Sequence, residues 1–142
     1  MKTKDIQDMM EQDSVIDATQ LDTESLKIPM LHNKYYNIYI EEYKILKALE
    51  TSLKKETKFK TEYYLGKCPD SVYTEKPLNL KILKADVETY IQTDNDIIEI
   101  NTKITIQKVK VDLIDAFIKQ INQRSFNIKN AIEFLRFKNG GY

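Results

Sequence analysis

The chain has 142 residues, of which 42% are apolar and 31% are charged, a composition typical of one folded domain and not of a disordered chain. Its 22 basic and 22 acidic residues cancel, so no overall field attracts DNA or a membrane. A lone cysteine, Cys68, excludes an internal disulfide and is typical of a reducing cytoplasm. We expect neither a signal peptide nor a membrane span, because no apolar run approaches 18 residues.

The charges are unevenly distributed along the chain. Residues 1–26 hold seven acids and two lysines, a net charge of −5. Residues 43–67 hold seven lysines and three glutamates, a net charge of +4. A neutral protein with separated charge of this kind can still present a basic face to a polyanion.

Helix breakers are rare, with three glycines and three prolines in the chain. Residues 30–65 and 78–139 contain neither, which predicts an all-α fold with long helices. After an acidic segment at about 3–12, the first long helix is predicted from about Thr19 to Leu65, bent or interrupted near Pro29. Its lysines gather opposite its apolar arc, as in an amphipathic helix; they are Lys44, Lys47, Lys54, Lys55 and Lys58.

Turn chemistry follows this helix. The stretch "GKCPDSVYTEKP" at 66–77 begins with a glycine, as is usual just past a helix end, and continues with Pro-Asp-Ser. A third helix is predicted from about Leu78 to Thr93. The sequence "TDND" at 93–96 offers side chains that cap the next helix.

The next helix carries a seam of apolar residues. From Ile97 to Ile121 they recur at alternating spacings of three and four, with one polar member, Gln107, which favours a coiled-coil-like helix. The alternation of Ile98, Ile100, Ile104 and Ile106 leaves a strand as the alternative. "NQRSFN" at 122–127 is expected to break the pattern before a last short helix.

A second apolar edge, from Ile106 to Phe117, makes the helix apolar on two sides. Two outcomes are therefore open: an intramolecular bundle, or homo-oligomerisation through residues 97–137. The candidate oligomerisation residues are Ile104, Val111, Ile114, Ile118 and Ile121. The predicted fold class is all-α, a long amphipathic helix plus C-terminal helices that form an oligomerising helical bundle with a coiled-coil-like core.

No enzyme constellation is present in the sequence. The single histidine, His32, and the single cysteine, Cys68, are too few for the mixed ligand sets of a zinc site. No glycine-rich phosphate loop occurs. We therefore expect no catalysis, no metal and no cofactor.

The most informative stretch is "LKKETKFKTEYYLGK" at 53–67. Lysine beside exposed aromatic residues suits single-stranded nucleic acid, because ammonium groups neutralise phosphates and aromatic rings stack on unpaired bases. The alternative is that the tyrosines pack on a neighbouring helix while the lysines are only solvated. The candidate nucleic-acid-binding residues are Lys54, Lys55, Lys58, Lys60, Tyr63 and Lys67. We expect Tyr64, which continues the apolar line of the helix, to pack instead.

Three segments in order resemble the UvsY family, the recombination mediators of T4-like bacteriophages. "KFKTEYYLGK" at 58–67 is similar to the family's Lys-x-Arg followed by an acid-Tyr-Tyr-x-Gly-basic run. "DSVIDATQL" at 13–21 resembles its Val-x-Ile-Asp-x-Thr entry, and "RSFNIKNAIEFLRFKNG" at 124–140 its Arg-x-Phe-x-Ile-Lys ending. The DNA-binding Lys-x-Arg falls on Lys58 and Lys60, where lysine in the second position loses the bidentate phosphate fork.

The resemblance implies a non-enzymatic, ring-like homo-oligomer, a hexamer or heptamer, that binds single-stranded DNA in the cytoplasm of an infected bacterial host. It also implies contacts with the phage RecA-like recombinase, which it loads, and with the single-strand-binding protein that covers the strand. The chain then divides into 1–67, the acidic segment and DNA-binding helix; 68–77, a linker; and 78–142, the oligomerisation region. The alternative function is a coiled-coil scaffold that never touches DNA.

Overall fold

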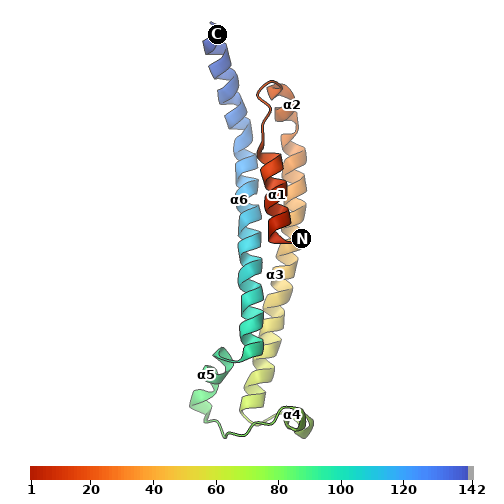
Figure 1. Cartoon of the computed structure of the whole chain (residues 1–142), viewed down its shortest axis with the longest axis vertical. Helices are drawn as coiled ribbons and strands as arrows, with labels where there is room; N and C mark the ends of the chain where they lie inside the picture. Colours follow the sequence, from red (N-terminus) through yellow and green to blue (C-terminus); the bar gives the residue numbers. More distant parts are fainter. Residues whose placement is uncertain (141–142) are drawn as a thin grey trace. The chain divides into compact units, whose positions relative to one another are not determined.

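The computed structural model describes residues 1–140 (Figure 1). Within them every regular element is helical, so the all-α prediction is confirmed. The elements are α1 (Thr3–Ser14), α2 (Leu21–Leu26), α3 (Ile28–Tyr64), α4 (Asp70–Glu75), the 3₁₀ turn η1 (Lys84–Asp86), α5 (Val87–Gln92) and α6 (Asn95–Lys138).

The chain divides into two compact units, and α3 and α6 each contribute to both. The first unit comprises residues 1–43 together with the chain from Val109 onward, and the second comprises Lys44–Lys108. The first therefore holds α1, α2, the start of α3 and most of α6. The second holds the end of α3, the connecting segment with α4 and α5, and the start of α6.

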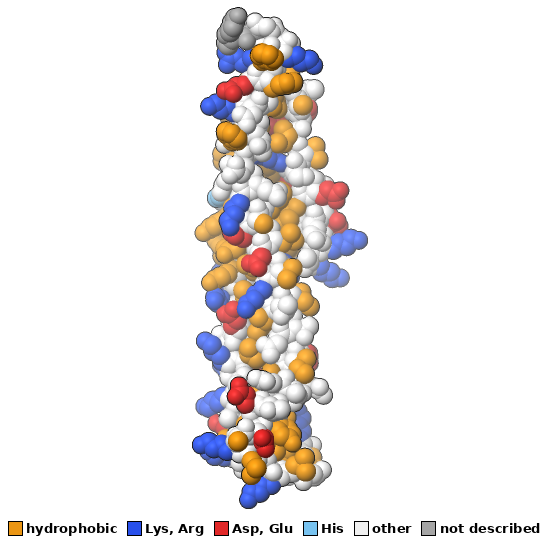
Figure 2. Space-filling model, turned by 90° about the vertical axis from the view of Figure 1, so that its left-hand side faces the viewer, with side chains coloured by type: hydrophobic (Ala, Val, Ile, Leu, Met, Phe, Trp, Pro, Cys, Tyr) orange, Lys and Arg blue, Asp and Glu red, His pale blue; other side chains and the backbone are white. Residues whose placement is uncertain are grey.

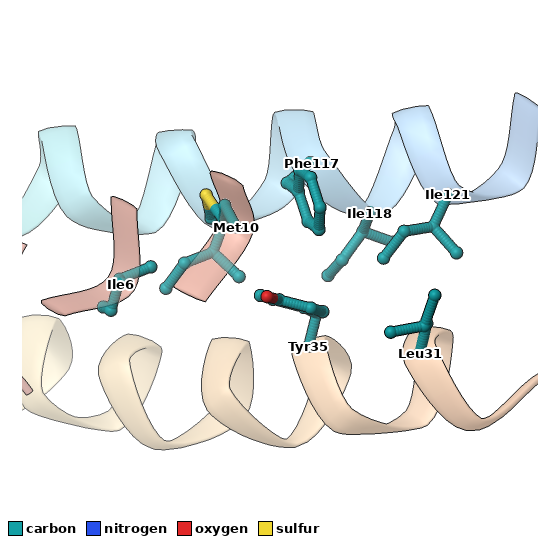
Figure 3. Packing of buried hydrophobic residues seen from close by; sticks show 8 residues of the cluster. Ile6, Met10, Leu31, Tyr35, Phe117, Ile118 and Ile121 are labelled. Atoms are coloured by element: carbon teal, nitrogen blue, oxygen red, sulfur yellow. The ribbon is translucent and has the colours of Figure 1, made fainter. Parts of the chain in front are cut away.

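The core of the first unit is built by three helices (Figure 3). Ile6 and Met10 come from α1, and Leu31 and Tyr35 come from α3. The side chains from α6 are Ile114, Phe117, Ile118 and Ile121. The Tyr35 ring meets the Phe117 ring edge to face, with centroids 4.6 Å apart, a geometry that adds to the hydrophobic stabilisation of the pair.

Polar contacts at Asp13 close one end of this core. The Asp13 carboxylate accepts a hydrogen bond from the Tyr35 hydroxyl and pairs with the Lys34 ammonium, both at 2.6 Å. Arg124, on α6, is buried and donates to the Asp13 carbonyl oxygen. Burial and the Asp13 carboxylate raise the pKa of the Tyr35 hydroxyl. The three helices are thereby tied together at one residue in the last turn of α1.

The predicted seam is the buried stripe of α6, and the strand alternative for residues 97–106 is wrong. Seven of its eight members are buried and Ile100 is half-buried; the buried ones are Ile97, Ile104, Gln107, Val111, Ile114, Ile118 and Ile121. The expected break at 122–127 is also wrong, because α6 runs unbroken to Lys138. Arg124 occupies the next position of the stripe with its donor satisfied, and the buried Ile128 follows.

The turns around α3 follow the sequence signals. The helix begins just after Lys27, so the chain is interrupted near Pro29 as expected. At the other end Gly66 adopts φ +76°, which only glycine adopts without strain. Its N–H donates to the Tyr63 carbonyl and that of Lys67 to the Glu62 carbonyl, the Schellman pattern of hydrogen bonds. The predicted turn at 66–77 also contains one short helix, α4.

The third predicted helix is mostly absent. Residues 78–83 are not helical, and only η1 and the six-residue α5 form before Thr93. Leu80 and Leu83 are 63% and 66% exposed, so a helix here would gain little from packing. Short helices without tertiary support are marginal in water, and residues 78–83 stay irregular although they contain no breaker.

Replacing Ile114, which is fully buried, with alanine is expected to lower the free energy of unfolding by about 2–5 kcal/mol, because the change opens a cavity in the core. Val109→Ala is the matched control on the same helix, since Val109 is 58% exposed. Its effect is expected to stay within about 0.5 kcal/mol. Urea unfolding followed by circular dichroism measures both, and equal small losses would place Ile114 outside the core.

Candidate nucleic-acid interface

Exposed lysines mark the last turns of α3. Lys54, Lys55 and Lys58 are exposed on this helix, and Lys67 is exposed just beyond it. Among residues 1–140, no carboxylate pairs with any of these four ammonium groups. Because Lys54 and Lys58 are four residues apart, they lie one turn above each other on the same side of the helix. These lysines are free to neutralise an external anion.

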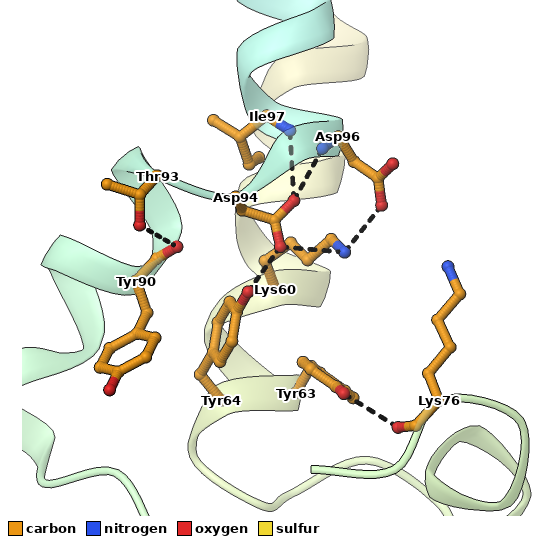
Figure 4. A network of polar contacts seen from close by, with 9 residues as sticks. All are labelled: Lys60, Tyr63, Tyr64, Lys76, Tyr90, Thr93, Asp94, Asp96 and Ile97. Carbon is orange, nitrogen blue, oxygen red and sulfur yellow. Dashed lines mark hydrogen bonds and ion pairs between the residues drawn. The ribbon is translucent and has the colours of Figure 1, made fainter. Parts of the chain in front are cut away.

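Lys60 is placed differently from its neighbours. Its side chain is only 7% exposed, and its ammonium lies 2.8 Å from an Asp96 oxygen and 3.2 Å from an Asp94 oxygen (Figure 4). The sequence predicted that Lys60 belongs with the DNA-binding lysines. In the structure its charge is already neutralised inside the second unit, because position 60 continues the buried side of α3.

Asp94 is the centre of this cluster. It is buried, and one carboxylate oxygen accepts the backbone N–H groups of Asp96 and Ile97 at 2.9 and 3.3 Å. This is the N-cap of α6 that the sequence predicted. Its other oxygen accepts the Tyr64 hydroxyl at 2.6 Å and pairs with Lys60. The end of α3 and the start of α6 are thus joined by one carboxylate.

The protonation states in the cluster are fixed by their neighbours. Burial alone pushes the pKa of Asp94 upward, but hydrogen bonds from Tyr64, Lys60 and the Ile97 N–H outweigh it and hold the pKa below 3.8. Burial likewise opposes the charge on Lys60, yet the two aspartates raise its pKa above 10.5. Burial and the Asp94 carboxylate raise the pKa of Tyr64 to about 12. At neutral pH the cluster is an ion pair with a neutral phenol.

The two adjacent tyrosines of α3, Tyr63 and Tyr64, make different contacts. Tyr64 is half-buried between Asp94 and the ring of Tyr90, whose centroid is 5.6 Å away, so it packs as expected. Tyr63, proposed for base stacking, already stacks on Tyr73 at 5.3 Å and donates its hydroxyl to the Lys76 carbonyl. The aromatic ring beside the lysines that stays more open is Phe59, at 37% exposed.

The candidate oligomerisation residues lie inside the chain. Ile114, Ile118 and Ile121 fill the core that α6 shares with α1 and α3, and Ile104 and Val111 are buried as well. Their role in oligomerisation stays a prediction. The same spacing continues to Ile132 and Leu135, which are 39% and 40% exposed. The sequence placed these two residues in a last short helix and within the range 97–137 considered for oligomerisation, but not among the candidate oligomerisation residues.

Other classes of site find little support in residues 1–140. No group of histidine, cysteine and acidic side chains is arranged to hold a metal ion. Among the helices described, none combines the length and the apolar character needed to cross a bilayer. The described residues form an all-α helical protein with exposed lysines near the end of α3 that pair with no carboxylate.

Comparison with known proteins agrees with that class and is more specific. The family described as "Recombination, repair and ssDNA binding protein UvsY" matches residues 9–141, and the chain belongs to this family of recombination mediators. The recombination protein uvsY of Enterobacteria phage T4 is 24% identical over 140 residues, which cover 99% of each chain. The resemblance found in the sequence is confirmed.

Two crystal structures of the bacteriophage T4 recombination mediator protein UvsY share this fold. One aligns with a TM-score of 0.84 at 24% identity and covers 99% of each chain. The other aligns with a TM-score of 0.80 at 23% identity and covers 97% of this chain and 99% of that one. At this level of identity the likeness establishes the common helical architecture.

Lys60→Met is expected to lower the free energy of unfolding by about 3 kcal/mol, because it leaves a buried carboxylate without its cation. Lys58→Met, at an exposed position, is the control and is expected to change stability by at most about 0.5 kcal/mol. A double-mutant cycle with Asp94→Asn isolates the pair. Strictly additive losses in that cycle would contradict the ion pair.

The stabilising effect of the cluster depends on pH with a definite sign. The lowered pKa of Asp94 contributes stability at neutral pH that is lost as the pH falls below 3.8 toward the folded-state value. The raised pKa of Lys60 contributes stability that is lost only as the pH rises above 10.5. The stability difference between wild type and Lys60→Met is therefore expected to be largest between these limits.

Proposed function

We propose that this protein binds single-stranded DNA through the lysine face of α3, defined as Lys54, Lys55 and Lys58. The observation that carries the proposal is that these ammonium groups are exposed and have no carboxylate partner within residues 1–140. Each lysine placed on a phosphate releases condensed counterions, which favours binding without reading sequence. The family's printed description, a recombination, repair and ssDNA binding protein, supports the same ligand.

The proposal separates the two lysines of the Lys58-x-Lys60 motif. Lys58 contacts phosphate. Lys60 pairs with Asp94 and Asp96 at the start of α6 and does not contact DNA. Phe59, between them in the sequence, is the most exposed aromatic side chain of the stretch 53–67 and is available for stacking on an unpaired base. The interface thus shifts from the face first predicted, which included Lys60 and Tyr63, to the outer side of α3.

We further propose that the protein acts as a recombination mediator in the cytoplasm of an infected bacterium and catalyses no reaction. In this role it loads a RecA-like phage recombinase onto strands covered by single-strand-binding protein. A ring of copies presents many weak lysine faces at once, so modest contacts sum to a useful avidity. Assembly into such a homo-oligomer is supported by the uncovered end of the α6 stripe, Ile132 and Leu135.

The triple variant Lys54→Ala, Lys55→Ala, Lys58→Ala is expected to weaken binding to an unstructured oligonucleotide. The slope of log affinity against log salt should become shallower by roughly 2, since each phosphate contact on a single strand contributes about 0.7. Lys103→Ala, an exposed lysine on α6, is the matched control and should keep the wild-type slope. Fluorescence anisotropy over a salt series measures both, and an unchanged slope in the triple variant would favour the scaffold that never binds DNA.

The double variant Ile132→Asp, Leu135→Asp is expected to dissociate the oligomer while keeping the helical fold. The reason is that both side chains are partly exposed in the single chain, and a carboxylate is costly only where a second copy would bury it. Ile114→Asp, within the core, should instead unfold the chain. Sedimentation velocity and circular dichroism distinguish these results, and a double variant that still assembles would remove the stripe end from the interface.

A further inference from the structure

An apolar pocket lies in the second unit, between the end of α3 and the segment formed by η1 and α5. Its volume is about 300 Å³, and it is lined by Thr61, Leu65, Lys84, Val87, Glu88 and Ile91. We call it the α3–α5 pocket. Figure 2 views the molecule from the side of α5, and hydrophobic side chains gather at its lower end with basic ones at their margin. A pocket of this size is at the lower limit of those that hold small organic groups.

Helical spacing places this pocket on the same side of α3 as two residues of the lysine face. Lys54, Lys58, Thr61 and Leu65 follow one another at spacings of four, three and four residues, so their side chains lie along one side of the helix. The N–H of Leu65 still donates to the Thr61 carbonyl at 3.1 Å, which continues the helical geometry to that residue. Thr61 follows Lys58 by about 4.5 Å along the helix axis. A strand that follows these lysines along the helix therefore meets the pocket next.

The lining residues suit a nucleobase and its phosphate. Leu65, Val87 and Ile91 form apolar walls, which favour the faces of an unpaired base over water. Lys84 is exposed, and in the part of the chain that the structure describes no carboxylate pairs with its ammonium group. Glu88 repels phosphate, but a carboxylate accepts hydrogen bonds from the amino groups of bases. The pocket thus combines an apolar interior with a free cation for the backbone.

We propose that the α3–α5 pocket takes one unpaired base from a strand bound on the lysine face, while Lys84 contacts the adjoining phosphate. This inference rests on the proposed binding of single-stranded DNA and adds a second kind of contact with the same ligand. The lysines bind any phosphate backbone, whereas the pocket holds only a base that has left its pair. A duplex supplies such a base at the cost of unpairing and unstacking it. The pocket therefore gives the protein a preference for single strands that the lysines alone do not provide.

Filling the pocket tests the base contact. Thr61→Leu places a larger apolar side chain in the pocket and a good helix former on α3. Fluorescence anisotropy is expected to show roughly tenfold weaker binding to an unstructured oligonucleotide, the effect of losing one engaged base. The salt slope should not change, because no phosphate contact is lost. A strand of the same length without bases should bind the variant and the wild type equally.

Thr105→Leu is the matched control. Thr105 is exposed on α6, and its hydroxyl, like that of Thr61, donates to the carbonyl four residues earlier. This variant should bind both strands like the wild type. Lys84→Ala tests the phosphate contact separately and should make the salt slope shallower by about 0.7, whereas Lys103→Ala should keep it.

The outcomes are distinct. If Thr61→Leu binds the intact strand like the wild type, or loses affinity equally for the strand without bases, the pocket holds no base, although the lysine face stands. A wild type whose affinity for the oligonucleotide does not depend on salt would overturn the lysine face and this inference with it. Circular dichroism reports the fold of each variant. Should Thr61→Leu lose helicity, Lys84→Ala decides, and an unchanged salt slope in that variant overturns the placement of the strand at the pocket.

Discussion

The buried carboxylate of Asp94 is the constraint on which the candidate interface depends. A charge in this position is tolerated only when its oxygens are satisfied, and here Lys60, Tyr64 and two backbone N–H groups do so. The cluster orients the end of α3, because Lys60 must point inward to meet it. The lysines on the other sides of the helix consequently face water, where a phosphate backbone is accessible to them.

Most of the fold features predicted correctly from the sequence were predicted from helical periodicity and local turn signals. The stripe of α6, the glycine that ends α3 and the Asp94 cap were all predicted, since each depends on residues close in the sequence. The separate roles of Lys58 and Lys60 were not predicted, because the partners of Lys60 lie more than thirty residues away. One signal was present: Lys60 follows Leu53 by seven residues and shares its side of the helix.

Polar residues on a buried stripe account for the main errors. A break was predicted at 122–127, although Arg124 in this stretch continues the buried stripe and donates to the Asp13 carbonyl oxygen in the last turn of α1. Lys60 on α3 is likewise a polar residue on the buried side of its helix, and its partner is the Asp94 carboxylate. The opposite error occurred at 78–83, where a helix was predicted because the segment contains no breaker, but Leu80 and Leu83 find no surface that would bury them. In each case the deciding contact, or its absence, is a tertiary one.

The most direct test of this account is the reactivity of individual lysines toward an amine-acetylating reagent, read by mass spectrometry with and without a single-stranded oligonucleotide. Lys54, Lys55 and Lys58 are predicted to react in the free protein and to be protected by the bound strand. Lys60, at 5% exposure, is predicted to stay unreactive in both states. A Lys60 that reacts freely and is then protected by DNA would contradict the division of labour on which the account rests.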